Sequence, residues 1–246
     1  MEGHEICDAK GAACALVKAA REVVEAYSVH VDPSDSKEKY RTIVLSHAMA
    51  FVVDGLSIIE SLLEQGATLH AKVMARSVFE VCARIQWAAH QVDGFGRLWA
   101  DGPHADLKWA NRAENHPDLE VPARGVKSDP TRMKLTQQFK ASPAAMDEIL
   151  RDIGKAPKHE RLDLDPEYIY MGVYRLYCKS THGEFLAMSV EGASDQSMHV
   201  ARVCSHAAIM LCFGLVKSFG LSLDDLEDAV GVFVEIAPLT KRKSGS

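Results

Sequence analysis

The chain has 246 residues, of which 47% are apolar and 25% are charged, and its net charge is −6 at neutral pH. A chain of this length buries a proper core, so neither a metal nor a disulfide is needed to hold the fold together. The acidic balance argues against broad, non-specific binding to nucleic acids or membranes, although it is compatible with a local basic patch. A length of 246 residues is enough for one large domain or two small ones.

The cysteines and the N-terminus predict a cytoplasmic protein. No two cysteines form a Cys-x-x-Cys pair, and most lie in apolar runs, where a free thiol behaves as a small hydrophobic group. The N-terminus begins with acidic residues and has no basic segment followed by an apolar one, so we expect no signal peptide. No run of 18 apolar residues is present, so we expect no membrane span. The cysteines are Cys7, Cys14, Cys82, Cys178, Cys204 and Cys212.

The first third of the chain repeats its apolar residues at helical spacing. This predicts a helix over residues 5–29 and, after a capping box formed by Asp35 and Glu38, a long helix to about Gln65. Gly66 fits the position after a helix end. The next helix, over about 68–92, has to turn back, which predicts a central antiparallel hairpin. The residues expected to face inward on the long helix are Tyr40, Ile43, Val44, His47, Phe51, Ile58, Ile59, Leu62 and Leu63.

Residues 93–131 differ in composition, because glycine, proline, aspartate and histidine are frequent there. We expect an irregular insertion, mostly loop, with one short helix over about 103–114. A short helix is predicted over 131–141. A further helix is predicted to start at Pro143, with Ser142 as its N-cap.

The last third again predicts helices. One begins at Asp165–Pro166 and reaches about Ser180, one runs from Asp195 to Phe219, and one starts with Ser222 and Asp225 and ends near Ile236. Alternating strand patterns are absent, so the prediction is an all-α fold. We expect a single bundle of about seven to nine helices over 1–240, followed by a polar tail over 241–246.

One predicted helix carries Arg76, Glu80 and Arg84 on a single face, at spacings of four residues. The simplest interpretation is a surface ladder in which each pair contributes about 0.2–0.5 kcal/mol. The alternative is a partly buried polar network that faces a cleft, because Trp87 lies beside the ladder in place of further charges.

Arg175 and His182 suggest a chemistry. Cleavage of RNA by its own 2′-hydroxyl needs a proton acceptor near that hydroxyl, and histidine titrates near neutral pH. It also needs a fixed cation on the phosphate, which arginine supplies. Among the polar neighbours, Tyr174 and Tyr177 could stack a base, and Ser180 could contact phosphate.

An arginine followed by a histidine with four to six residues between them occurs four times in the chain, so the pattern alone has little specificity. The other pairs are Arg41/His47, Arg84/His90 and Arg97/His104. The competing interpretation of Arg175 and His182 is structural, because cations are favourable near the C-terminal end of a helix.

Metal and cofactor signatures are missing. There is no Glu-x-x-His, no His-Glu-x-x-His and no zinc spacing, and no glycine-rich phosphate loop occurs. Because these signatures are missing, we expect no cofactor. A soft-metal or haem site at His199 and His206, with Cys204 and Met210 nearby, is a third alternative.

The segments "ARSVFEVCARIQW" and "YRLYCKSTHGE" together resemble a bacterial family described as a domain of unknown function. In that family an early helix reads Leu-Arg-x-x-x-Glu, matched by Arg76 and Glu80. A later helix ends Tyr-x-x-x-Ser-x-x-His, matched by Tyr174 or Tyr177, Ser180 and His182, with one residue between serine and histidine instead of two. The resemblance covers about 40–220 and implies an all-helical, cytosolic bacterial protein.

A second resemblance, carried by Arg175 and His182, is to the HEPN superfamily. Leu176 departs from it, because a polar residue usually follows the arginine there. This resemblance implies a metal-independent endoribonuclease, or an RNA-binding defence or toxin-type protein, with sites formed between the protomers of a homodimer. Arg76, Glu80 and Arg84 would support the site. RNA is then the expected partner, with no signal for DNA. The alternative is a non-catalytic helical scaffold or a protein that binds a small ligand or anion.

Overall fold

The computed structural model describes residues 2–28, 39–116, 118–160 and 193–220, and every structural statement below concerns them. This part of the chain contains eight α-helices, one short 3-10 helix and no strand, so the predicted all-α fold is confirmed. The helices are α1 (Glu2–Ser28), α2 (Lys39–Glu64), α3 (Thr68–Ala89), α4 (Gly94–Ala113), α5 (Glu120–Ser128), α6 (Pro130–Gln138), α7 (Met146–Ile153) and α11 (Ala193–Phe219), and the 3-10 helix is η1 (Lys158–Glu160).

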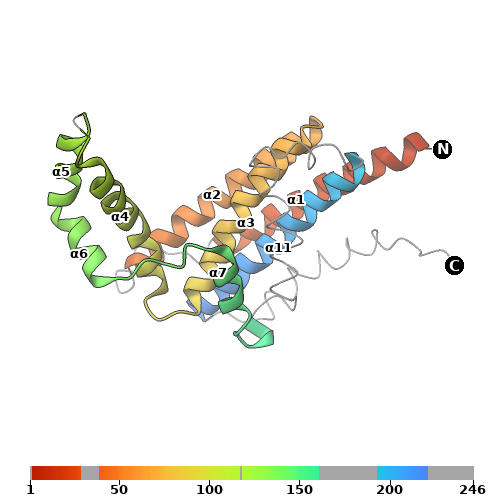
Figure 1. Ribbon diagram of the computed structural model, residues 1–246. Helices are drawn as coiled ribbons and strands as arrows, with labels where there is room; N and C mark the ends of the chain where they lie inside the picture. The colour runs from red at the N-terminus through yellow and green to blue at the C-terminus, as the bar shows by residue number, and fades with distance from the viewer. Residues whose placement is uncertain (1, 29–38, 117, 161–192, 221–246) are drawn as a thin grey trace.

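Four long helices form the body of the molecule. In Figure 1, α1, α2, α3 and α11 lie side by side, and α3 packs against both α2 and α11 while α1 packs against the same two helices. The shorter α7 packs on α3. Their apolar faces enclose the main core, because amphipathic helices are stable only when these faces are covered. Its largest fully buried side chains are Leu45, Leu56, Ile59, Leu63, Phe79, Ile85, Trp87, Ile149, Leu150, Met210 and Leu211.

The α2–α3 hairpin confirms the predicted central pair of antiparallel helices. Gly66 has a φ of 75°, the left-handed conformation that glycine adopts without steric cost. Its N–H donates to the carbonyl of Leu63 at 3.0 Å, and the N–H of Ala67 donates to Leu62 at 2.8 Å. These bonds satisfy carbonyls that would otherwise be unpaired at the end of α2. The chain therefore reverses within three residues.

The predicted inward face of α2 is partly wrong. His47 is exposed, and Phe51 and Ile58 are 42% and 45% exposed, whereas Leu45, Val52 and Leu56 are fully buried. The physical reason is that α2 carries apolar residues around much of its circumference, while α1 and α3 cover only part of it. Periodicity alone could not fix which side faces the core.

The region predicted as a loop-rich insertion is mostly helical, so that prediction is wrong. Helices α4, α5 and α6 form an arm that extends away from the four long helices (Figure 1). The glycines at its start serve close packing: a Cβ on Gly94 would lie 2.2 Å from the carbonyl oxygen of Ala88, and one on Gly96 would lie 2.4 Å from the Phe139 ring. Asp93, with φ of 58°, turns the chain between α3 and α4.

The predicted N-cap at Ser142 is also wrong. The next helix, α7, begins only at Met146, and Ser142 instead bonds Asp101 of α4 through both its N–H, at 2.8 Å, and its hydroxyl. Asp129 is the cap that the sequence analysis missed. Its carboxylate accepts from the N–H groups of Thr131 and Arg132, and Pro130 occupies the first turn of α6.

The long helix predicted from Asp195 to Phe219 is confirmed as α11. Cys82, Cys204 and Cys212 are buried as free thiols, and burial raises the pKa of Cys204 and of Cys212 to about 12. They thus act as small apolar groups. The helices predicted over 166–180 and 222–236, and the capping box at Asp35, lie outside the described residues.

Two of the described helices are long and apolar enough to cross a membrane by length and composition, namely α2 and residues 196–219 of α11. Both also contribute to the core of the bundle, and 72% of the apolar window in α11 is buried. Core helices of soluble proteins meet the same criteria.

Candidate functional site

The Arg–Glu–Arg ladder predicted on α3 is divided in the structure. Arg76 Nε donates to Glu80 Oε1 at 2.9 Å, and the two side chains are only 18% and 29% exposed. This pair is partly buried, as the second interpretation of the ladder requires. Neither of the two cavities described below is lined by it.

Arg84 turns away from Glu80 toward the root of the arm. Its Nη1 donates to Ser142 Oγ at 3.0 Å and to the carbonyl of Pro143 at 3.2 Å, and lies 3.9 Å from Asp101 Oδ2. This guanidinium therefore ties α3 to α4 and to the segment before α7. These contacts give Arg84 a structural role.

The proposed catalytic pair, Arg175 and His182, and its neighbours Tyr174, Tyr177 and Ser180 lie outside the described residues. The other three Arg–His pairs lie within the described residues. Arg41 donates to the carbonyl of Ser218 at 2.7 Å, His90 Nδ1 lies 3.5 Å from Glu160, and His104 Nε2 lies 2.8 Å from the carbonyl of Phe139. These three pairs make contacts that hold helix ends together.

The two histidines of α11 are both half-buried. Burial first, and then the charges of His199 and Arg202, lower the pKa of His206 to about 4. The described part of the chain contains no group of three or more histidine, cysteine, aspartate or glutamate side chains able to hold a metal ion. Because of its low pKa, the half-buried imidazole of His206 is neutral at neutral pH.

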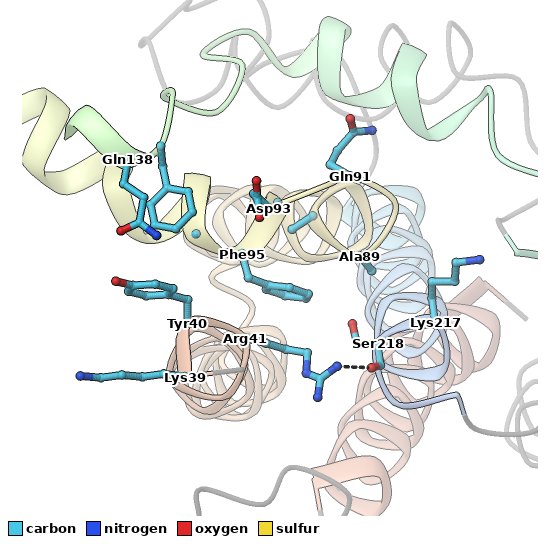
Figure 2. A pocket seen from close by; sticks show the side chains of 14 residues that line it. Lys39, Tyr40, Arg41, Ala89, Gln91, Asp93, Phe95, Gln138, Lys217 and Ser218 are labelled. Atoms are coloured by element: carbon cyan, nitrogen blue, oxygen red, sulfur yellow. Dashed lines mark hydrogen bonds between the residues drawn. The ribbon is translucent and has the colours of Figure 1, made fainter. Parts of the chain in front are cut away.

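A cavity of about 580 Å³ lies where the start of α2, the α3–α4 turn and the ends of α6 and α11 converge. We call it the corner cavity, and Figure 2 shows its side chains. Its volume is within the range of small-molecule sites. The described residues that line it are Lys39, Tyr40, Arg41, Ala88, Ala89, Gln91, Asp93, Gly94, Phe95, Gly96, Gln138, Phe139, Lys217 and Ser218.

Positive charge dominates the described lining of the corner cavity. Lys39, Arg41 and Lys217 contribute three cations, against one carboxylate from Asp93. In Figure 2 the Arg41 side chain extends from α2 toward α11, where it donates to Ser218. Its guanidinium also lies 5.1 Å from the centre of the Phe219 ring. Three cations from two helices therefore line one cavity, although the whole chain is acidic, and in Figure 2 the Lys39 and Lys217 side chains extend in opposite directions.

The position of two of these cations is unusual for a helix. Lys39 and Arg41 lie in the first turn of α2, which has no acidic residue. The helix dipole places partial positive charge at this end, so carboxylates are favourable there and cations are not. Arg41 has a structural role through Ser218. Lys39 is exposed, and no contact with another described residue explains its position. An anion in the cavity would be attracted by both cations and by the helix end.

Aromatic rings also line the cavity. The rings of Tyr40 and Phe139 meet edge to face, with centres 5.2 Å apart and planes at 82°, and Phe95 adds a third ring. The amides of Gln91 and Gln138 lie on the same lining. The cavity thus combines cations with flat apolar surfaces and neutral hydrogen-bonding groups.

The sequence analysis did not find this cavity, because its residues come from segments between positions 39 and 218. No local signal marked it. The predicted start of this helix is the capping box of Asp35 and Glu38, whose carboxylates suit a helix N-terminus, and Lys39 and Arg41 only follow them.

The comparison with protein families gives one result. The model of the family of unknown function DUF5677 matches residues 42–199, more than half of the chain. No curated protein and no solved structure matches the chain. The expected resemblance to a family of unknown function is therefore confirmed, over 42–199 where about 40–220 was expected. The chain belongs to the DUF5677 family.

Proposed function

We propose that the protein binds a small anionic ligand in the corner cavity. The observation that carries this proposal is the group of three cations, Lys39, Arg41 and Lys217, around a cavity of about 580 Å³. Hydrogen bonds to charged groups contribute about 1.5–3 kcal/mol each, more than neutral ones. Such a set favours phosphate, sulfate or carboxylate groups. The ligand carries a flat apolar part as well, which fits against Tyr40 and Phe95.

Replacement of Lys39 by alanine should weaken anion binding about five- to tenfold, the effect of losing one exposed charged contact. Lys39 is exposed, so the variant keeps its fold. Isothermal titration calorimetry of the full chain with inorganic phosphate, pyrophosphate and phenyl phosphate gives the affinities. Phenyl phosphate should bind more tightly than inorganic phosphate, because only its ring contacts the aromatic wall.

The matched control is Lys108→Ala, which removes an exposed lysine of the arm outside the cavity lining and should leave the affinities unchanged. The proposal fails if none of the three anions binds to the wild-type chain at millimolar concentration. It also fails if Lys39→Ala and Lys108→Ala weaken binding equally.

A second candidate function is metal-independent cleavage of RNA by Arg175 and His182, in the cytoplasm and in a homodimer. The support for it is the Arg–His pattern and the chemistry described above, in which the imidazole accepts a proton and the guanidinium holds the phosphate.

The test of the ribonuclease is total-RNA integrity after expression of the wild-type chain, His182→Ala or Arg175→Ala. We expect wild type to degrade RNA and both variants to leave it intact, because the base and the phosphate cation are each lost. Circular dichroism checks that the variants fold, and gel filtration gives the oligomeric state. Purified wild type that leaves mixed RNA intact in EDTA would exclude this function.

A further inference from the structure

A second cavity, of about 650 Å³, adjoins the corner cavity. We call it the His90 cavity. It shares Ala89, Gln91 and Lys217 with the corner cavity, so the two spaces meet at the end of α11. Its remaining described lining is His90, Val92, Asp152, Lys155, Ala156, Pro157 and Glu160.

A chain of contacts leads from the corner cavity to His90. Lys217 Nζ lies 2.9 Å from Glu160 Oε1, and the other carboxylate oxygen of Glu160 lies 3.5 Å from His90 Nδ1. One carboxylate is therefore shared between a lysine and an imidazole. Gln86 holds the backbone of Glu160 in place, because its amide donates to the Glu160 carbonyl at 3.2 Å.

His90 is held in an enclosed position. Its side chain is 10% exposed, and its Nε2 is buried with no hydrogen-bond partner. The charged groups that face it are Asp152, Lys155, Glu160 and Lys217. Asp152 is already bound by Lys155, at 2.7 Å, and among the described residues Glu160 and Lys217 are the charges that act on the imidazole.

These charges act in opposite directions. Burial is the largest influence and lowers the pKa of His90, Glu160 raises it, and Lys217 lowers it again. At neutral pH the imidazole is therefore neutral. Any change that removes Lys217 from Glu160 makes the protonated imidazole more favourable, because the ammonium charge that lowers the pKa of His90 then lies farther from the ring.

We propose that Lys217 couples anion binding in the corner cavity to protonation of His90. This inference rests on the proposed function. Lys217 lines both cavities, and its side chain is 42% exposed at the end of a flexible stem. A bound anion draws the ammonium group from Glu160 toward the corner cavity. Glu160 then has His90 as its partner, and the imidazole takes up a proton.

The coupling has a definite direction with pH. In the free protein the pKa of His90 lies below 6.5, and the proposed coupling would raise it in the bound protein. His90 therefore takes up a proton when the anion binds at pH values near and below 6.5. The affinity for the anion rises as the pH falls over that interval. A change of one pKa unit corresponds to about tenfold in affinity, so an increase of about three- to tenfold between pH 7.5 and pH 5.5 is expected.

The experiment is calorimetry with sulfate, because sulfate keeps its double negative charge over this range. Titrations of the full chain at about pH 6 in two buffers of different ionisation enthalpy give the number of protons taken up per anion. Wild type should take up a substantial fraction of one proton. His90→Gln should bind sulfate without this uptake. Lys217→Met should bind about fivefold more weakly, and its affinity should be nearly independent of pH.

The control is His70→Gln, which removes an exposed imidazole at the other end of α3 and should leave the uptake in place. Sulfate binding without proton uptake by wild type would overturn the coupling and leave the proposed function standing. Uptake that persists in His90→Gln, or in Lys217→Met, would also overturn it. Absence of sulfate binding would overturn both proposals.

Discussion

Replacement of Trp87 by alanine should lower the free energy of unfolding by about 3–5 kcal/mol, the range for loss of a large buried aromatic side chain. Trp87 is 1% exposed and is the largest fully buried side chain described. Its Nε1 donates to Asp152 Oδ2 at 3.3 Å, and the guanidinium of Arg97 lies 4.7 Å from the centre of its ring. The indole thus joins α3 to α7 and to the root of the arm.

The Trp87→Ala variant loses three kinds of interaction, and each loss lowers its stability. The cavity left by the ring removes packing on all sides. Asp152 loses one of its donors: hydrogen bonds from Lys155 and then from Trp87 hold the pKa of this carboxyl below its ordinary value. Arg97 loses the aromatic face on which it lies. Trp87→Phe keeps much of the ring and should cost only about 1–2 kcal/mol, because it removes mainly the N–H donor.

The measurement is urea denaturation followed by circular dichroism, since the substitution removes a fluorophore. Trp109→Ala is the matched control, because Trp109 is 42% exposed on α4 and its loss should change stability by less than about 1 kcal/mol. Equal losses in Trp87→Ala and Trp109→Ala would contradict the assigned role of Trp87.

Acid should destabilise the protein through His206. In the folded protein the pKa of this imidazole is about 4, against an ordinary value of 6.5, and burial is the main cause. The imidazole is therefore protonated below about pH 6.5 in the unfolded chain, but only below about pH 4 in the folded protein. Stability falls as the pH decreases through this interval, and the gap corresponds to about 3 kcal/mol. Below both values this group causes no further loss.

The test compares wild type with His206→Gln, which has no titrating group at this position. Unfolding free energies at about pH 7.5 and about pH 4.5 should differ by about 2–3 kcal/mol more in wild type than in the variant. The contribution of His90 has the same sign but is common to both proteins, so it cancels in the difference. His206→Leu serves the same purpose if glutamine impairs folding. Equal acid sensitivity of wild type and variant would show that His206 is not the source.

The hairpin of α2 and α3 could be predicted because its signals are local. A short connection and one glycine in the left-handed conformation determine it, and both are visible in the sequence around Gly66. The arm could not be predicted in the same way. Gly94 and Gly96 indicate a loop to any local analysis, and only the contacts with Ala88 and Phe139 explain why glycine is required inside a helical region.

In the candidate site, too, contacts between residues near in sequence could be predicted, whereas contacts between distant residues could not. Arg76 and Glu80 were predicted as a pair because four residues on a helix bring them together, and they form an ion pair. Arg84 has the same spacing from Glu80, but Asp101 and Ser142, distant in sequence, give it better partners. The corner cavity depends wholly on such distant contacts, and no spacing within one helix could have indicated it.

The bounds of the family match divide the lining of the corner cavity. Lys39 and Arg41 precede the segment 42–199 that matches the DUF5677 family, and Lys217 follows it. Phe95, Phe139, Gln91 and Gln138 lie inside that segment. The anion site that we propose thus takes its three cations from the two flanking segments and most of its aromatic and amide groups from the family segment.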